Sequence, residues 1–442
     1  LLLMPLICVG LWGCPSKTVS NACDGWSKLT PNLDESLMHI ECFLRGDSRD
    51  CKWTAELYDE GKLVAAVTGS ASQPLQVAVT DPKRWEPDSP FLYDVKIKLT
   101  YQDKILDEVT SYCGFRKIDI AKDEQGTMRI RLNNQPVFQY GPLDQGYWPE
   151  GLQTPPSEEA MLFDLQYLKN IGCNMVRVHM KVHPARWYHL CDRLGLLVWQ
   201  DMVSTWLLDA KITAESAQQW EFEWKEMIDH LYHYPSIIQW IVFNESWGQY
   251  DTERITDWTM KQDPSRLVTG ASGWTDVEIG HVHDTHDYSF HPAVPAMGIF
   301  QDRAVVLGEC GGFDLLLPGH IWHEGQSLPL KNDDVIEIER ECYADPEEFE
   351  ARYTQWLEQV LLLKNHGLCA AVYTQLSDIE HEANGWLTYD REVSKIEIAT
   401  LKHMHDRLRL EVNNDWQPLL PEDHEWTYHM TDHPDEKRKG LA

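Results

Sequence analysis

The sequence predicts two main domains: an immunoglobulin-like β-sandwich over residues 21–118 and a (β/α)8 TIM barrel over residues 119–412. Two patterns predict this fold. Up to about residue 118, short runs alternate apolar and polar residues, whereas beyond it apolar runs alternate with longer helical stretches. The length of 442 residues fits two or three domains. A composition of 43% apolar and 25% charged residues is ordinary for a globular chain.

The N-terminal domain is predicted from strands that have one apolar face. Residues 37–44, 53–58 and 93–99 alternate in this way, and a turn at 59–62 precedes another apolar pair. We find no good helical pattern in this region. About 100 residues of such strands are typical of a sandwich of the immunoglobulin type.

The barrel is predicted from eight short apolar strands separated by helices. The first helix should begin at Ser157, a good N-cap that is followed by two glutamates. The helix expected between the fifth and sixth strands, Gly270 to Thr285, has no convincing pattern. The predicted strands are 137–140, 175–179, 196–200, 237–243, 267–270, 285–288, 304–307 and 370–374, and the predicted helices are 157–170, 184–194, 216–232, 252–262, 346–365 and 394–408.

Charge and cysteine content exclude several classes of function. With 39 Lys and Arg against 70 Asp and Glu, the net charge of −31 argues against binding nucleic acid or an anionic membrane surface. No apolar run is long enough to span a bilayer. The 11 Cys form no Cys-x-x-Cys pair, which favours buried free thiols over a metal site or a dense disulfide framework. Fifteen of the 19 Trp follow residue 120, and they suit sugar rings as well as a large core.

The predicted barrel has a carboxylate at the end of two of its strands. Glu245 follows the fourth strand and Glu309 follows the seventh. Barrel enzymes carry their functional groups at these C-terminal ends, so both side chains should face one mouth. Glycoside hydrolysis needs such a pair, one to protonate the leaving oxygen and one to attack the sugar or activate water. Either glutamate alone would more readily be an ordinary loop residue.

The chain resembles glycoside hydrolase family 2, the family of β-galactosidases, β-glucuronidases and β-mannosidases. The resemblance extends over about residues 20–410, and in combination its motifs are highly specific. They are Trp85-Glu86-Pro87 with Gly114-Phe115-Arg116, Leu132-Asn133-Asn134-Gln135-Pro136, Asn174-Met175-Val176-Arg177, Cys191-Asp192-Arg193-Leu194-Gly195 and Asn244-Glu245-Ser246.

The resemblance implies a retaining double displacement with an immunoglobulin-like domain before the barrel. Glu245 would be the acid/base and Glu309 the nucleophile. Asn244 would hydrogen-bond the sugar 2-hydroxyl, and Tyr288 would orient the nucleophile. The pair Thr374-Gln375 stands where β-glucuronidases and β-galactosidases carry a Trp, which puts the identity of the sugar in doubt.

Further substrate-binding residues are expected around the same mouth. Arg177 and His179 point the same way on the second strand, although an ion pair of Arg177 with Asp201 is nearly as plausible. Gln145, Tyr147 and Trp148 follow the first strand and could form a rim that stacks on sugar. The remaining candidates are Trp247, His286 and Gln375. The alternating histidines His281, His283 and His286 favour hydrogen bonding over a metal.

The two ends of the chain depart from the family. Residues 1–20 are predicted to be either the last strand of the family's sugar-binding jelly-roll domain, most of which is missing, or a signal-like segment without a basic start. Residues 413–442 do not continue the barrel and resemble the start of a further β domain. A periplasmic or secreted location is somewhat favoured.

The sequence thus predicts a retaining, exo-acting β-glycosidase of the β-galactoside or β-glucuronide type. The alternatives are an endo-acting β-mannanase or β-glucanase with the same barrel, and a carbohydrate-binding pseudoenzyme. We expect no cofactor and no metal. The expected partner is an oligosaccharide or a glycoside derived from a polysaccharide, and a homo-oligomer is left open.

Overall fold

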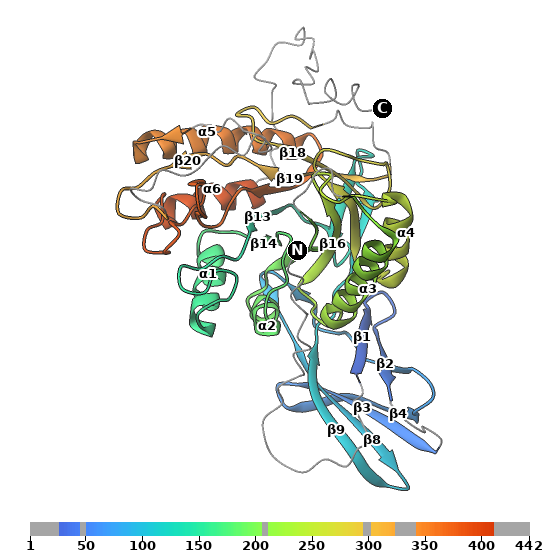
Figure 1. The fold of residues 1–442 in the computed structure, drawn as a ribbon. Helices are drawn as coiled ribbons and strands as arrows, with labels where there is room; N and C mark the ends of the chain where they lie inside the picture. Colours follow the sequence, from blue (N-terminus) through green and yellow to red (C-terminus); the bar gives the residue numbers. More distant parts are fainter. Residues whose placement is uncertain (1–25, 45–49, 206–210, 295–301, 323–341, 411–442) are drawn as a thin grey trace. The chain divides into compact units, whose positions relative to one another are not determined.

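The structure, a computed structural model, describes residues 26–44, 50–205, 211–294, 302–322 and 342–410 (Figure 1). The predictions for residues 1–20 and 413–442 lie outside the described residues. The two predicted main domains are represented by antiparallel sheets followed by a parallel barrel, so the predicted fold class is confirmed.

The N-terminal region consists of two antiparallel sheets. One has the order β1-β2-β5 and the other β4-β3-β8-β9. Alternate residues of β3 and β8 are buried, among them Trp53, Leu57, Val95 and Leu99, and they share one core with Met38 of the first sheet. The strands are β1 (Trp26–Asn32), β2 (Leu37–Phe43), β3 (Cys51–Asp59), β4 (Lys62–Ser70), β5 (Leu75–Ala78), β8 (Tyr93–Tyr101) and β9 (Lys104–Cys113), with the short hairpin β6 (Trp85–Glu86) and β7 (Ser89–Pro90) between β5 and β8.

A small antiparallel sheet that was not predicted precedes the barrel. It consists of β10 (Ile118–Lys122), β11 (Met128–Leu132) and β12 (Gln135–Pro136). Ile130 and Leu132 of this sheet pack in one apolar cluster with residues near the start of the barrel strands, such as Met175 and Leu197. The sheet therefore covers the N-terminal end of the barrel, opposite the mouth.

Eight parallel strands form the barrel in the order β17-β16-β15-β14-β13-β22-β19-β18. The two ends of this order are joined by a bridge between Thr269 and Gly280 and by a hydrogen bond from His281 N to Val268 O of 2.9 Å, so the barrel is nearly closed. The strands are β13 (Gln139–Asp144), β14 (Met175–Val178), β15 (Leu197–Asp201), β16 (Ile237–Asn244), β17 (Leu267–Ser272), β18 (Val282–Asp287), β19 (Ala304–Cys310) and β22 (Leu368–Tyr373), and the short β20 (Asp314–Leu315) pairs with β21 (Cys342–Tyr343) outside the barrel.

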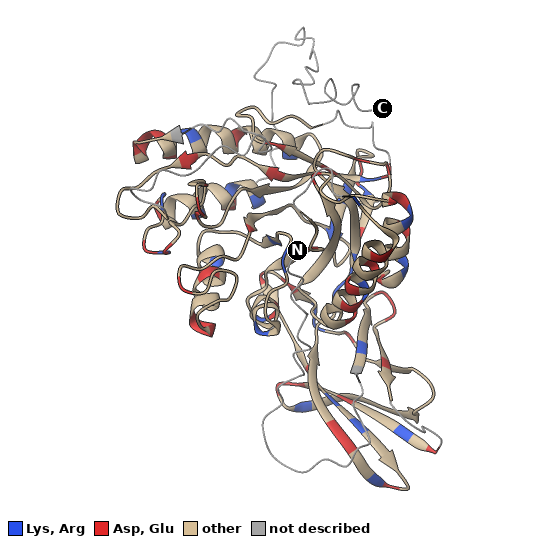
Figure 2. Cartoon of the chain, in the orientation of Figure 1, with Lys and Arg blue, Asp and Glu red and all other residues tan. Residues whose placement is uncertain are grey.

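The helices follow the prediction closely. Ser157 accepts a hydrogen bond from Ala160 N at the start of the first helix, as its N-cap position predicts, and Gly195 ends the second in a left-handed conformation. Residues 273–281 join β17 to β18 without a helix, in the segment that has no convincing helical pattern. The helices are α1 (Glu158–Asn170), α2 (Ala185–Leu194), α3 (Ala214–Leu231), α4 (Thr252–Gln262), α5 (Pro346–Asn365) and α6 (Ile398–Leu410), and the acidic residues recur along α3, α4 and α5 (Figure 2).

The predictions about membrane spans and about the cysteines can be compared with the described residues. None of the described helices is long and apolar enough to cross a membrane. The cysteines whose state is given are free thiols, as predicted: Cys42 is half-buried, and Cys51, Cys113, Cys173, Cys191, Cys310 and Cys369 are buried.

Polar contacts connect the N-terminal sheets to the barrel. Arg116 is 3% exposed and donates to the carbonyl oxygens of Pro235, Ser265 and Ile237 at 3.1, 2.7 and 2.9 Å. Tyr112 Oη donates to the carboxylate of Asp192 at 2.7 Å. Because Arg116 and Asp192 are buried, loss of their partners would leave a desolvated polar group unpaired.

Candidate active site

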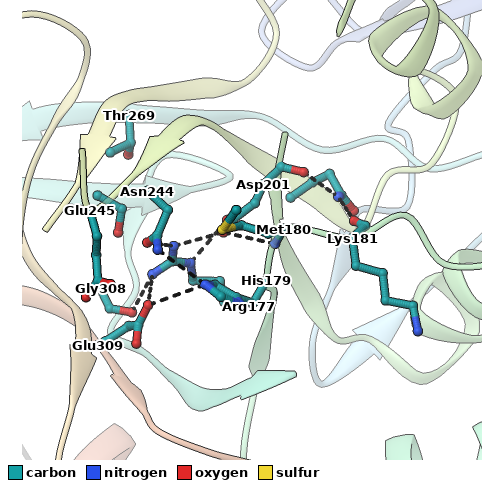
Figure 3. Close-up of polar contacts among 12 residues, drawn as sticks. Arg177, His179, Met180, Lys181, Asp201, Asn244, Glu245, Thr269, Gly308 and Glu309 are labelled. Carbon is teal, nitrogen blue, oxygen red and sulfur yellow. Dashed lines mark hydrogen bonds and ion pairs between the residues drawn. The ribbon is translucent and has the colours of Figure 1, made fainter. Parts of the chain in front are cut away.

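The two predicted glutamates lie at the C-terminal ends of β16 and β19, at one mouth of the barrel. The strand β16 is buried along its whole length, and Glu245 is the first residue after it. Glu309 is the sixth residue of β19 and is 4% exposed. Figure 3 shows both side chains beside Asn244 and Arg177. The strand ends thus bring together carboxylates that are 64 positions apart in the chain.

The backbone at Glu245 has an uncommon conformation. Its φ is +49°, and Ser246 follows with a φ of +64°, so two residues that carry a Cβ are left-handed in succession. Such residues cost roughly 1 kcal/mol or more each. Glu245 N donates to Ser272 O at 2.8 Å, and the Ser246 hydroxyl contacts that of Thr275. These contacts hold the turn that directs Glu245 into the mouth.

The two carboxylates are close enough for a direct attack mechanism. One oxygen of Glu245, one oxygen of Glu309 and one nitrogen of His286 all lie within 4.8 Å of one another. Retaining glycosidases have their carboxyl groups about 5–5.5 Å apart, and inverting enzymes about 6.5–9.5 Å. Oxygens within 4.8 Å place the two carboxylates nearer to the retaining range than to the inverting range, and retention stays a prediction.

Arg177 lies beneath the pair and makes both of the predicted kinds of contact. It forms a two-bond ion pair with Asp201 at 3.1 and 2.9 Å. It also donates to Asn244 Oδ1 at 2.8 Å and to Glu309 Oε1 at 3.3 Å (Figure 3). Arg177 and Asp201 are 0% and 1% exposed, so the contacts described are with protein groups that they orient. A contact of either residue with substrate stays a prediction.

Asn244 has a defined amide orientation because of these contacts. Since Oδ1 accepts from Arg177, Nδ2 is the atom that faces His179 Nε2, at 3.3 Å. His179 Nε2 must then accept, which requires a neutral ring. Burial lowers the pKa of His179 to about 4, in agreement with this assignment. The second N–H of Asn244 Nδ2 is left for a further acceptor.

Glu309 receives a second orienting contact from the neighbouring strand. Tyr288, one residue after β18, donates its hydroxyl to Glu309 Oε2 at 2.6 Å. With Arg177 on Oε1, each oxygen of Glu309 is held by a different donor. The geometry matches the prediction that Tyr288 orients this carboxylate.

His286 lies between Glu245 and Ser272. Its Nδ1 lies 2.7 Å from Glu245 Oε1 and 3.7 Å from Glu309 Oε1, and its Nε2 lies 2.8 Å from Ser272 Oγ. The side chain has no exposed surface. Both ring nitrogens face protein groups, and direct binding of substrate by His286 stays a prediction.

Three further residues that the sequence predicts as substrate contacts lie at the mouth: Trp247 beside Glu245, and Gln145 with Gln375 at adjacent strand ends. Trp247 Nε1 donates to Glu245 Oε2 at 3.3 Å and is half-buried. Gln145 and Gln375 lie at adjacent strand ends, where Gln145 Nε2 donates to Gln375 Oε1 at 3.0 Å and Gln375 Nε2 donates to Glu382 at 2.8 Å. These residues remain candidates for sugar contacts.

Trp148 does not belong to an exposed stacking rim. It is 4% exposed, packs in the main barrel core, and has the guanidinium of Arg391 4.3 Å from the centre of its ring. Its burial and the contact with Arg391 argue against stacking on sugar, and that role stays a prediction. The sequence pattern could not distinguish a core tryptophan from a rim tryptophan.

Burial and neighbouring charges shift the pKa values of the three central groups. Burial disfavours ionisation of Glu245, but the hydrogen bond and charge of His286 outweigh it and lower its pKa. Burial and then the charge of Glu245 raise the pKa of Glu309, against the opposing effects of His286 and Arg177. Burial opposes a charge on His286, but Glu309 and Glu245 raise its pKa above the ordinary value.

Two groups of side chains in the described residues have a spacing that could hold a metal ion. One is the central set of Glu245, His286 and Glu309, and the other is His320, Asp390 and Glu392. In the first set, the Arg177 guanidinium already occupies the position beside Glu309 Oε1 and would repel a cation. The prediction that no metal is needed therefore stays a prediction supported by this charge.

Sequence reasoning missed Ser272, which holds His286 from the end of β17. The predicted fifth strand ended at Gly270, two residues too early, so Ser272 was not recognised as a strand-end residue. Gly273, next in the chain, was missed as well. A Cβ there would lie 2.9 Å from His286 Nδ1, so the backbone packs directly on the imidazole.

Comparison with known proteins gives matches in both parts of the chain. Residues 28–116 match the model of glycosyl hydrolases family 2, and residues 155–303 match the model of that family's TIM barrel domain. Together the two matches cover just over half of the chain. A putative β-glucuronidase from Formosa agariphila is 30% identical over 256 residues, and a β-galactosidase from Leuconostoc mesenteroides is 26% identical over 277 residues.

These two alignments cover 55% and 57% of this chain but only 24% and 25% of the relatives, so the chain spans about a quarter of their length. The structure is similar to that of an FMN-binding β-glucuronidase from Faecalibacterium prausnitzii, with a TM-score of 0.69, 17% identity, and coverage of 86% of this chain and 61% of that one. It is also similar to a Ruminococcus gnavus β-glucuronidase solved with D-glucuronic acid, with a TM-score of 0.67, 18% identity, and coverage of 88% and 68%.

Proposed function

Because the chain belongs to glycosyl hydrolases family 2, we propose that it is a retaining, exo-acting β-glycosidase that releases terminal β-linked sugars of the galactoside or glucuronide type. The observation that carries this proposal is the pair of carboxylates within 4.8 Å at one barrel mouth, each held by its own donors. A protein that only bound sugar would have no need of an acid and a nucleophile at this spacing.

In the first step, Glu309 attacks the anomeric carbon and Glu245 protonates the leaving oxygen. Tyr288 and Arg177 keep Glu309 in one orientation, which lowers the entropy lost in reaching the transition state. In the second step, Glu245 removes a proton from water, which cleaves the glycosyl ester at Glu309. The free N–H of Asn244 is positioned to donate to the sugar 2-hydroxyl.

The proposed sugar class rests on the relatives named above, one described as a β-galactosidase and one as a putative β-glucuronidase. Hydrolysis of a panel of p-nitrophenyl β-glycosides tests the proposal, and the panel should include the galactoside, glucuronide, glucoside and mannoside. We expect turnover of one or two members. Activity only on long β-mannan or β-glucan chains would indicate the endo-acting alternative, and binding without turnover would indicate a pseudoenzyme.

The roles of the two glutamates can be tested separately. Glu309→Ala should abolish turnover of every substrate, whereas Glu245→Ala should spare the first step for good leaving groups, because these need little protonation. Added azide should restore turnover of Glu245→Ala and give a β-glycosyl azide. A 2-deoxy-2-fluoro glycoside of the preferred sugar should label the peptide that contains Glu309, and a label on Glu245 would reverse the assignment.

A further inference from the structure

The directions in which the pKa values of the two glutamates are shifted are the opposite of those that their proposed roles require. The acid/base must carry a proton when the substrate arrives, and the nucleophile must be ionised. In the protein without substrate, the pKa of Glu245 is lowered and that of Glu309 is raised. A proton must therefore reach Glu245 from a neighbouring group before the first step.

His286 is the neighbour whose geometry suits this transfer. Its Nδ1 lies 2.7 Å from Glu245 Oε1, a hydrogen-bond distance, while Nε2 lies 2.8 Å from the hydroxyl of Ser272. When Nδ1 gives up its proton, the ring keeps Nε2–H, which Ser272 Oγ can accept. The ring is thus stable in both proton states without moving.

Every element packed against His286 contributes to its charge environment. Glu245 from β16 and Glu309 from β19 face Nδ1, at 2.7 and 3.7 Å, and favour a cation. Arg177 from β14 lies 3.4 Å from Nε2 and disfavours it. Asp284 on its own strand is buried, and burial raises the pKa of that carboxyl.

The neutral His179 also belongs to this environment, because its ring interacts electrostatically with that of His286. Ser272 from β17 is uncharged, so two carboxylates near Nδ1 are opposed by one full positive charge near Nε2. The balance favours a proton on Nδ1.

We propose that His286 is a positioning residue that stores the catalytic proton on Nδ1 and passes it to Glu245 as the leaving oxygen approaches. This inference rests on the proposed glycosidase function. At rest the set holds one shared proton, on His286, with Glu245 and Glu309 ionised. Transfer to Glu245 Oε1 gives a protonated acid, a neutral imidazole and an ionised nucleophile, which is the state the first step requires.

The protons balance over the full cycle. In the first step, Glu245 gives the transferred proton to the leaving oxygen, and the C–O bond to the leaving group is replaced by an ester bond to Glu309. In the second step, Glu245 takes a proton from water as hydroxide displaces Glu309 from the sugar. That proton returns along the same hydrogen bond to Nδ1 of His286, which restores the starting state.

Two variants separate proton storage from simple orientation. His286→Ala removes both the hydrogen bond and the proton. His286→Asn places an amide N–H near the position of Nδ1 and can still donate to Glu245, but it has no proton to transfer. His283→Asn is the matched control, since His283 is on the same strand with its Nδ1 2.8 Å from Asp276, away from the two catalytic glutamates.

The assay compares kcat/KM for a p-nitrophenyl glycoside with that for the methyl glycoside of the same sugar, at several pH values. Both His286 variants should lose about 100-fold or more on the methyl glycoside, the range of general acid catalysis, and little on the nitrophenyl glycoside. The alkaline limb of the pH profile should move to lower pH, because the stored proton then resides on carboxyl groups alone. The ratio of the two substrates does not depend on how much of a variant is folded.

Three results would overturn the inference. Full activity of His286→Asn on both substrates would mean that His286 only orients Glu245, and an equal loss on both substrates would mean a structural role. The same leaving-group effect in His283→Asn would show that any change in this strand produces it. If the wild-type protein turns over no glycoside, the proposed function itself fails, which is a separate and recognisable outcome.

Discussion

Replacement of Asp192 by Asn should make the protein more stable at neutral and alkaline pH. Asp192 is fully buried where the N-terminal sheets meet the barrel, and it accepts from Tyr112 Oη at 2.7 Å and from Ser236 N at 2.8 Å. Burial raises the pKa of its carboxyl from 3.8 to about 7, although both hydrogen bonds oppose this. An amide at this position keeps one acceptor for Ser236 N and never ionises.

The size of the effect follows from the difference in pKa between the folded and unfolded chains. A raised pKa gives stability that is complete below pH 3.8, decreases as the pH rises, and is lost above about pH 7. The full difference corresponds to about 4 kcal/mol, at 1.36 kcal/mol per pKa unit. Roughly 2 kcal/mol of it is lost between pH 5.5 and 8. The Asp192→Asn variant lacks this loss.

Urea unfolding followed by tryptophan fluorescence at pH 5.5 and pH 8 measures the effect, in a range above the isoelectric point of about 4.9. The stability of Asp192→Asn relative to the wild type should increase by about 2 kcal/mol over this range. Tyr112→Phe serves as a control, because loss of its hydrogen bond should raise the pKa of Asp192 further. A relative stability that does not change with pH would refute the reasoning.

Four other predictions concern the site. Trp148→Phe should leave KM unchanged, because the ring is buried, and a large rise in KM would restore it to the sugar-binding rim. Arg177→Lys should lower kcat by about 10- to 100-fold, because lysine cannot keep the two-bond pair with Asp201 while holding the glutamate above it; a kcat close to that of the wild type would contradict this. Gly273→Ala should lower the melting temperature and weaken hydrolysis of substrates with poor leaving groups. The added Cβ would lie 2.9 Å from His286 Nδ1, and the backbone φ of +97° is unfavourable for alanine. An unchanged melting temperature and unchanged hydrolysis of both kinds of substrate would show that the imidazole can shift freely. Treatment with EDTA should leave activity unchanged, whereas a loss reversed by one specific ion would establish a metal requirement.

Periodicity predicted the main elements well where the pattern was strong. The strand at residues 237–243 is fully buried and was predicted to within one residue of β16. The strand at 285–288 was placed late, since β18 runs from Val282 to Asp287 and has polar residues at every position after Val282, although buried and half-buried positions alternate along it. Its inward polar residues, Asp284 and His286, belong to the site, and they hide the apolar pattern on which a prediction depends.

The convergence of Glu245 and Glu309 at one barrel mouth was predictable because each glutamate comes at the end of a largely apolar strand. The contacts below the pair were less predictable, since they depend on how strands from different parts of the chain align. Arg177, for example, meets Asp201, Asn244 and Glu309 from three other strands. No local pattern shows that such an arginine is fully enclosed, so the sequence could not decide between a contact with substrate and an ion pair with Asp201.

The turn after β16 is a poor place to increase the thermal stability of this protein by substitution. If Glu245 is the acid/base, as proposed, its left-handed backbone cannot be relieved by substitution without loss of that group. Ser246 is the adjacent position where a change is open, because glycine adopts a φ of +64° without steric cost. The gain of about 1 kcal/mol would be offset by loss of the hydroxyl contact with Thr275. Stabilising substitutions are therefore better sought at positions remote from this turn, where they do not change the orientation of Glu245.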